Sequence, residues 1–224
     1  MGVPLLLGHR GCRLPKFHEN TISAFAHAID SGCDGFEFDI RSTSDEYAVC
    51  LHDPSIGDKV IAECTYDDFC KDSFKSGKSE IATLNQVVEK FGNSAFLNIE
   101  LKVRGLEEQV LEIVKELSQD RFVISSFQSE IICRIRELDP EVPVGFIFGT
   151  VDGLRSWPIL PGPYVIPNCD LVTPALVDSV HEAGRKLFSW TVNRPAEMKR
   201  LADWGVDGLI SDNPALLCKT LRRG

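Results

Sequence analysis

The sequence predicts an α/β fold in which parallel strands alternate with helices along the whole chain of 224 residues. About eight short apolar runs are typical of core strands, and helix-like segments separate them. No linker or low-complexity tract divides the chain, so we expect residues 1–224 to form one domain. Two arrangements of the parallel sheet satisfy this pattern, an open sheet and a closed barrel. An open doubly wound sheet lacks its glycine-rich nucleotide fingerprint here, and a (β/α)8 TIM barrel typically has ~250 residues, slightly more than this chain.

The elements follow one another in regular order. Residues 5–9 predict the first strand, which runs into the loop Gly8-His9-Arg10-Gly11. Residues 21–31 predict the first helix, with Asn20 or Thr21 as its N-cap. Later strands are expected at residues 35–41, 95–102, 122–127, 144–148, 164–167, 186–192 and 208–211, and a further short extended piece is expected at residues 48–52. Later helices are expected at residues 84–91, 106–117, 129–138, 174–183, 195–204 and 214–221.

Two segments carry no clear element. Residues 53–80 are polar and mixed, and we interpret them as a small insertion after the second strand, at the mouth of the domain. Residues 149–163 are rich in glycine and proline, and we predict no element there.

Composition narrows the possible partners and location. The formal net charge is −9 and no basic run occurs, which argues against nucleic acid and anionic lipid as partners because both need clustered Lys and Arg. No apolar run approaches the ~20 residues of a membrane helix, and residues 1–7 lack the basic start of a signal peptide. The eight cysteines form no Cys-x-x-Cys pair, so we interpret most as small buried hydrophobes and expect a reducing, cytoplasmic setting.

Two predicted strands carry alternating acidic residues. Glu37 and Asp39 are two positions apart, so they share one strand face while the neighbouring Phe and Ile side chains share the other. Glu100 and Lys102 repeat the device. Carboxylates gathered in this way either have raised pKa values or bind a hard cation such as Mg²⁺ or Ca²⁺. The alternative is that Glu37 and Asp39 lie on the solvated face of an edge strand.

Two of the five histidines follow strand-like runs. His9 and His52 stand where barrel enzymes place catalytic groups, and histidine can give or take a proton at neutral pH. Surface or packing roles are expected for the others, His18, His27 and His181. Arg10 and Lys102 suit phosphate oxygens, although either could instead be an ion-pair partner of the carboxylates.

Eight short motifs together resemble the glycerophosphodiester phosphodiesterase family. They occur in the family's order and span nearly the whole chain. The motifs are Gly8-His9-Arg10-Gly11, Glu19-Asn20-Thr21, Gly35-Phe36-Glu37-Phe38-Asp39, His52-Asp53, Asn98-Ile99-Glu100-Leu101-Lys102, Ser125-Ser126-Phe127, Trp190-Thr191-Val192-Asn193 and Gly205-Val206-Asp207-Gly208.

The resemblance implies a (β/α)8 barrel that hydrolyses glycerophosphodiesters to glycerol 3-phosphate and an alcohol. It implies one divalent cation, Mg²⁺ or Ca²⁺, and a substrate glycerol hydroxyl that attacks phosphorus to give a cyclic phosphate, which water then opens. The implied roles are His9 and His52 as the acid/base pair, Glu37, Asp39 and Glu100 as metal ligands, Arg10 and Lys102 on the phosphate, and Trp190 in the substrate pocket. A barrel-core role is the alternative for Trp190.

The sequence departs from the family at two places. His18 stands where the family usually has Pro before Glu-Asn-Thr, and the segment around His52 lacks the family's frequent Asp-Gly and longer polar insertion. Headgroup choice, the identity of the cation, the oligomeric state and the role of residues 53–80 therefore stay open. The alternatives to a soluble glycerophosphodiester as substrate are phospholipase D-like cleavage of lysophospholipids and a non-catalytic barrel that binds a phosphorylated ligand.

Overall fold

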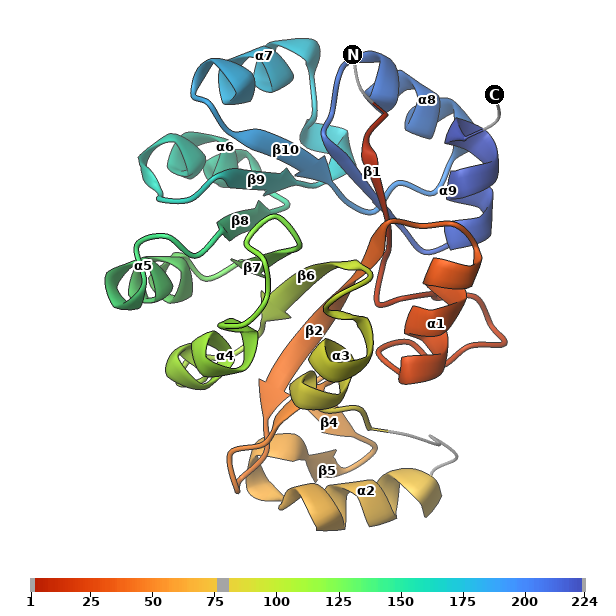
Figure 1. Ribbon diagram of the computed structural model, residues 1–224, viewed down its shortest axis with the longest axis vertical. Coiled ribbons are helices and arrows are strands. Elements are labelled where there is room, and N and C mark those ends of the chain that lie inside the picture. The colour runs from red at the N-terminus through yellow and green to blue at the C-terminus, as the bar shows by residue number, and fades with distance from the viewer. Residues whose placement is uncertain (1–2, 76–80, 223–224) are drawn as a thin grey trace.

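Eight parallel strands close into a barrel in the computed structural model, which describes residues 3–75 and 81–222 (Figure 1). Each strand pairs in parallel with the next around the barrel, and pairing of the first strand with both the second and the last completes the ring. The strands are β1 (Leu5–Gly8), β2 (Gly35–Ser42), β6 (Phe96–Leu101), β7 (Phe122–Ser126), β8 (Val144–Phe148), β9 (Tyr164–Pro167), β10 (Lys186–Ser189) and β11 (Gly208–Ser211). The structure thus confirms the barrel and excludes the open sheet.

Helices surround this barrel (Figure 1). They are α1 (Ile22–Asp30), α3 (Leu84–Phe91), α4 (Glu107–Val114), α5 (Ser129–Leu138), α6 (Val151–Ser156), α7 (Pro174–Glu182), α8 (Pro195–Asp203) and α9 (Pro214–Leu221). Several of the helices begin at a polar N-cap residue. The hydroxyl of Thr21 accepts from the backbone N–H of Ala24, and Thr83 and Gln86 form a reciprocal capping box. In the described residues, no helix combines the length and apolar character needed to cross a membrane.

The strands are buried on both faces, so the fold has an outer and an inner core. On β2, Phe36, Phe38 and Ile40 pack outward in the cluster shared with the helices. The residues between them face inward. The inner cluster fills the barrel interior and comprises Leu7, Phe96, Val123, Ile147, Tyr164, Ile166, Phe188 and Ile210. The alternation predicted for β2 therefore separates its apolar face from its acidic one.

The insertion after β2 is more structured than its composition indicated. β3 (Ala48–Cys50) pairs antiparallel with the end of β2 and lies outside the ring, in agreement with the short extended piece expected at residues 48–52. A hairpin of β4 (Ser55–Ile56) and β5 (Lys59–Val60) follows, then the 3-10 turn Ile61–Glu63 and α2 (Tyr66–Lys75). Val49, Leu51, Ile61, Phe69 and Ile81 form a separate apolar cluster beneath it. The insertion thus folds on a small core of its own beside the barrel (Figure 1).

Residues 149–163 also contain structure that was not predicted. α6 begins after Thr150, and the 3-10 turn Trp157–Ile159 follows it directly. Gly153, which argued against a helix in the sequence, is needed there because a Cβ would lie 2.4 Å from side-chain atoms of Phe148. Close approach of the helix to β8 explains this glycine.

A matched pair of glycine substitutions tests the tight β2–β6 contact. A Cβ on Gly35 would lie 1.8 Å from the carbonyl oxygen of Phe96, so we expect Gly35→Ala to lower the free energy of unfolding by about 3 kcal/mol or more, the upper end of overpacking. Urea denaturation measures the change. Gly149→Ala is the control, because the nearest atoms to its Cβ are 3.7 Å away on Trp190 and the expected change is within about 0.5 kcal/mol. Equal losses in the two variants would contradict the packing argument.

Candidate active site

A cavity of about 270 Å³ opens where the C-terminal ends of the barrel strands meet. It is lined by His9, Arg10, Arg13, Glu37, His52, Asn98, Glu100, Lys102, Phe127, Ile147, Ile166, Trp190, Thr191 and Ile210. Seven of the eight residues that the sequence put forward are among these, and the eighth, Asp39, is buried beside them. Residues of the inner apolar cluster line the same cavity. The fold therefore brings the expected residues together at the end of the barrel where (β/α)8-barrel enzymes place their active sites.

Three carboxylates converge at one wall of this cavity. The β2–β6 register sets Asp39 directly beside Glu100, and Glu37 is two residues before Asp39 on the same face. One oxygen from each carboxylate lies within 4.8 Å of the others. Glu37, Asp39 and Glu100 are only 3%, 1% and 7% exposed. The solvated-edge alternative for Glu37 and Asp39 is thus wrong, because β2 lies between two parallel neighbours.

Burial without full charge compensation raises the pKa of two of these acids. Desolvation is the main cause for Glu37, whose pKa is well above its ordinary value, and the charges of Asp39 and Glu100 add to it. Desolvation and the charge of Asp39 raise the pKa of Glu100 to about 7, against the opposing effect of Lys102. Near neutral pH, protons and other cations therefore compete for binding to this cluster.

Two basic side chains already contact the cluster. The Nζ of Lys102 lies 2.5 Å from Glu100 Oε1 and 3.3 Å from Asp39 Oδ1. The Nε of Arg10 lies 3.2 Å from Asp39 Oδ2, and its backbone N–H donates to Glu37 Oε2 at 2.9 Å. Although burial opposes it, Glu100 and Asp39 raise the pKa of Lys102, which keeps the amine charged. Arg10 and Lys102 are thus ion-pair partners of the carboxylates, as the alternative from the sequence allowed, and both also line the cavity.

The donor set fits a hard divalent cation. Glu37 Oε1 is buried and, among the described residues, has no hydrogen-bond partner. An unsatisfied buried carboxylate oxygen is costly, and a cation at this point would satisfy it. The three candidate ligands offer only oxygen atoms, which suit Mg²⁺ or Ca²⁺ better than softer metals.

His9 is held by a carboxylate that the sequence analysis missed. Its Nδ1 lies 2.7 Å from Asp212 Oδ1, and Asn193 donates to the other oxygen of Asp212 at 2.7 Å. Because an ionised carboxylate can only accept, Nδ1 carries the proton and Nε2 has its lone pair. That Nε2 lies 3.8 Å from Glu37 Oε2, at the cluster. Burial lowers the pKa of His9, with Asp212 opposing, so the neutral form is favoured.

His52 repeats this arrangement from outside the barrel. Its Nδ1 lies 2.8 Å from Asp53 Oδ1, and its backbone carbonyl accepts from Nε of Arg41 at 2.7 Å. His52 follows the antiparallel β3, so it comes after a strand-like run as the sequence predicted, but this strand lies outside the barrel ring. About a third of its side chain is exposed, whereas His9 is buried. The two imidazoles differ in their exposure to solvent, but each has its Nδ1 in contact with an aspartate that orients the ring.

Two further sets of contacts surround the cavity, one in the loop before α1 and one at Trp190. Glu19 accepts from Arg10 and Arg13 at 2.6 Å each, which fixes the loop before α1. Trp190 donates through Nε1 to the carbonyl of Ile166 at 3.1 Å, and its ring meets that of Phe127 edge to face. The indole lines the cavity and also packs against the inner apolar cluster of the barrel, so it contacts both. Asp212 could have been found from the sequence because it directly follows the last barrel strand, β11. Glu19 could have been found because it belongs to the motif Glu19-Asn20-Thr21.

The other histidines lie away from this cavity. The ring of His27 stacks on Phe17 with centroids 4.1 Å apart, and Nε2 of His181 lies 2.9 Å from Asp207 Oδ2. Both contacts fit the packing and surface roles expected from the sequence. His18 is exposed and lines a neighbouring cavity.

Comparison with known proteins gives one consistent result. The model of the glycerophosphoryl diester phosphodiesterase family matches residues 9–216. A glycerophosphodiester phosphodiesterase of Caldanaerobacter subterraneus subsp. tengcongensis is 31% identical, over 98% of each chain. The solved glycerophosphodiester phosphodiesterase of Thermotoga maritima is 25% identical, with a TM-score of 0.82 over 98% of this chain and 99% of that one. An Oleispira antarctica phosphodiesterase, solved with its product sn-glycerol-3-phosphate, shares the fold at 23% identity and a TM-score of 0.84, over 99% and 98% of the two chains.

The Asp212–His9 contact leads to a prediction about titration. In Asp212→Asn the hydrogen bond can persist but the negative charge is lost, so we expect the pKa of His9 to fall further below its ordinary value. NMR titration of the imidazole signals in EDTA-treated protein measures this. Asp207→Asn is the matched control, since Asp207 pairs with His181 and should leave His9 unchanged. An unchanged or higher pKa of His9 in Asp212→Asn would argue against the assigned pair.

Proposed function

Because the chain belongs to the glycerophosphodiester phosphodiesterase family, and is thus a hydrolase of glycerophosphodiesters, we propose that His9 and His52 transfer its protons at a centre holding one divalent cation. The products are glycerol 3-phosphate and an alcohol. The observation that carries the proposal is the pair of imidazoles at one carboxylate-lined cavity, each oriented by an aspartate through Nδ1. The same aspartate–histidine arrangement orients proton-transfer groups in other hydrolases.

Charge supports the proposed cation. Glu37, Asp39 and Glu100, when ionised, exceed Arg10 and Lys102 by one negative charge. A divalent cation held by the three carboxylates would turn this into one positive charge, which matches the single negative charge of a phosphodiester. When bound, the ion would supply charge neutralisation at a phosphoryl oxygen. Arg10 and Lys102 would bind the other phosphate oxygens as hydrogen-bond donors.

The two histidines take different roles in the first half of the reaction. Buried and neutral, His9 suits the base that takes the proton from the attacking glycerol hydroxyl through Nε2, while Asp212 stabilises the imidazolium formed. The bond from this oxygen to phosphorus forms as the bond to the leaving alcohol breaks. Protonated His52 gives its proton to the departing oxygen. The cyclic phosphate is then opened by water, with His52 as base and His9 returning its proton to the glycerol oxygen.

The finer assignments of substrate and setting belong to the same proposal. We take the whole chain, residues 1–224, as the catalytic unit and a soluble glycerophosphodiester as its substrate, supported by the net charge of −9, which disfavours an anionic lipid surface. No disulfide joins any of the eight cysteines, all of which lie in the described residues, and this supports a reducing, cytoplasmic setting. A purely ligand-binding barrel has no observation in its favour, since every proposed proton-transfer and ligand group is present.

Removal of either imidazole should abolish most turnover. We expect His9→Ala and His52→Ala each to lower kcat for glycerophosphocholine by about 10²–10⁴-fold, the usual contribution of a proton-transfer group. Release of glycerol 3-phosphate measures turnover, and thermal unfolding checks the fold. His181→Ala, which removes a histidine outside the cavity, serves as the control. Near-normal turnover in either variant would refute the acid/base assignment.

Cation binding should depend on pH in a defined direction. Below a raised pKa the carboxyl group is protonated and is a poor ligand, so the increase in Tm produced by Mg²⁺ or Ca²⁺ should be larger at pH 8 than at pH 6, given a pKa of about 7 for Glu100. At a free cation concentration of 100 times Kd, binding should increase the free energy of unfolding by about 2.7 kcal/mol. EDTA should silence the enzyme, and Glu100→Gln, but not the surface variant Glu112→Gln, should lose the Tm effect. Full activity of exhaustively chelated protein, with no metal by elemental analysis, would overturn the site.

A further inference from the structure

Two cysteines that are far apart in the sequence meet at the end of the barrel opposite the candidate active site. Cys33 lies just before β2, and Cys218 is in α9, 185 residues later. Their sulfur atoms are 3.5 Å apart, and α9 packs beside α1, which ends shortly before Cys33 (Figure 1). We propose that Cys33 and Cys218 form a site of reversible oxidation, at which hydrogen peroxide converts the two thiols to a disulfide that ties the last helix to the start of β2.

The close approach of the two chain segments makes this bond possible. A disulfide needs an S–S distance of about 2.0 Å and backbones that are already near each other. The turn after α1 approaches Cys218 closely, because a Cβ on Gly32 would lie 3.8 Å from its Sγ and 3.9 Å from its Cβ. The sulfur of Cys33 already contacts that of Cys218. Small rotations of the two side chains therefore suffice to bring the sulfurs together.

The environment of the pair identifies Cys218 as the sulfur that reacts first. A hydrogen bond from the Cys33 thiol lowers the pKa of Cys218, and the positive charge of Arg222 adds to this effect, although burial opposes both. The same hydrogen bond, together with burial, raises the pKa of Cys33, which therefore keeps its proton. The thiolate is the form of cysteine that attacks a peroxide. Cys218 is thus the nucleophile, and Cys33 is the thiol that completes the disulfide.

The guanidinium of Arg222 is fixed beside this pair. Arg222 ends α9, and its backbone N–H donates to the carbonyl of Cys218 at 2.9 Å. Its guanidinium donates to the carbonyl of Gly32 and lies 2.5 Å from Asp34 Oδ1. Asp34 in turn accepts from the backbone N–H of Leu6 at 2.8 Å. The charge that favours the thiolate is therefore held by contacts with both segments that the disulfide would join.

The oxidation balances in two steps. The Cys218 thiolate attacks one oxygen of hydrogen peroxide, the O–O bond breaks, and the departing hydroxide takes a proton from solvent to become water. The sulfur of Cys33 then attacks the resulting sulfenic acid and loses its proton, so the S–S bond forms and a second water leaves. The two thiols lose two electrons, and the peroxide gains them. Cys33 and Cys218 are 7% and 8% exposed, which leaves access for an oxidant little larger than water.

The position of the bond indicates what it does. α9 packs against β1 and α1, so the disulfide would join the first and last strand–helix units of the barrel. A crosslink between residues 185 positions apart restricts the unfolded chain strongly and stabilises the fold. A disulfide of this kind is consistent with a reducing setting, where such bonds are transient and respond to oxidants.

Oxidation of the wild-type protein tests the proposal without measuring turnover, so the result does not depend on the function proposed above. After treatment of reduced protein with hydrogen peroxide, we expect a crosslinked Cys33–Cys218 peptide by mass spectrometry. We also expect a rise in Tm of roughly 5 °C or more, reversed by dithiothreitol. Two thiols that only pack together would show neither change. Absence of the crosslinked peptide, or an unchanged Tm in protein that contains it, would overturn the proposal.

Single substitutions test the assigned order of reaction. In Cys33→Ser the serine hydroxyl can still donate to Cys218, so peroxide should leave a sulfenic acid there that dimedone labels. In Cys218→Ser we expect no label on Cys33, and neither variant should gain Tm with peroxide. Cys133→Ser, which removes a half-buried thiol from α5, is the matched control and should form the disulfide as the wild type does. Equal labelling of Cys33 and Cys218 would contradict the order, and a rise in Tm in either single variant would contradict the disulfide as its cause.

Discussion

The burial of three carboxylates at one point is the constraint on which the rest of the site depends. Glu37, Asp39 and Glu100 have ligand oxygens within 4.8 Å of one another, and two unit charges ~4 Å apart repel by about 4 kcal/mol at an effective dielectric near 20. Lys102 and Arg10 offset part of this repulsion, and raised pKa values reduce the rest by keeping protons bound. One oxygen of Glu37 nevertheless stays unsatisfied. A scaffold that holds such a cluster is stabilised by any cation that enters it.

The loop after β1 is shaped to serve this cluster. Arg10 and Asn20 both have left-handed backbones, with φ of 49° and 60°, and such a conformation costs roughly 1–2 kcal/mol for a residue with a side chain. In return, Asn20 donates to Asp39 Oδ2 at 2.8 Å and accepts from its backbone N–H, while Arg10 reaches both Glu37 and Asp39. The acidic residues on β2 and the strained loop therefore form one structural unit. Glu19 extends this unit to Arg13, which lines the cavity of the candidate active site.

Local pattern predicted the acidic face, but not the partners that complete it. Alternation along a strand was enough to put Glu37 with Asp39, and Glu100 with Lys102, because the period of a strand is fixed by its backbone. The β2–β6 register sets Asp39 beside Glu100. This register depends on packing between the strands and could not be predicted from the sequence. Asp212 is 203 residues from His9 and carries no local signal beyond its place after a strand. The barrel itself was settled by motif resemblance, since alternation alone also fits an open sheet.

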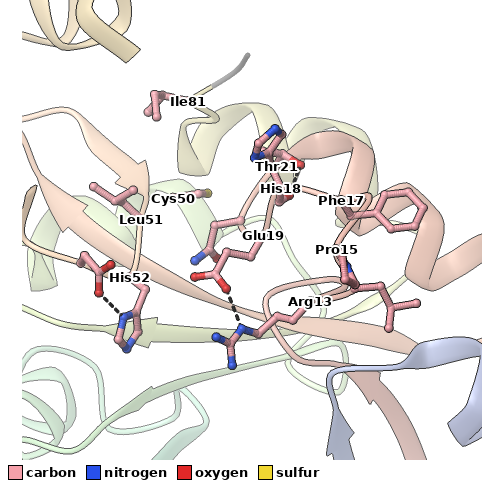
Figure 2. Close-up of a pocket in the computed structure, with 13 residues that line it drawn as sticks. Arg13, Pro15, Phe17, His18, Glu19, Thr21, Cys50, Leu51, His52 and Ile81 are labelled. Atoms are coloured by element: carbon pink, nitrogen blue, oxygen red, sulfur yellow. Dashed lines mark hydrogen bonds and ion pairs between the residues drawn. The ribbon is translucent and has the colours of Figure 1, made fainter. Parts of the chain in front are cut away.

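The cavity of the candidate active site and the cavity beside it differ in the elements that form their walls, and this difference explains where amino-acid substitutions are tolerated. The catalytic cavity is formed largely by ends of barrel strands, whose positions are fixed by the ring of hydrogen bonds. The neighbouring cavity, of about 310 Å³, is formed largely by loop and insertion residues, and one of its lining residues is His18, where this chain departs from the family's usual proline (Figure 2). Loops tolerate substitution better than paired strands do. Substitutions can thus alter the wall of this neighbouring cavity while Glu37, Asp39 and Glu100 stay in place on paired strands.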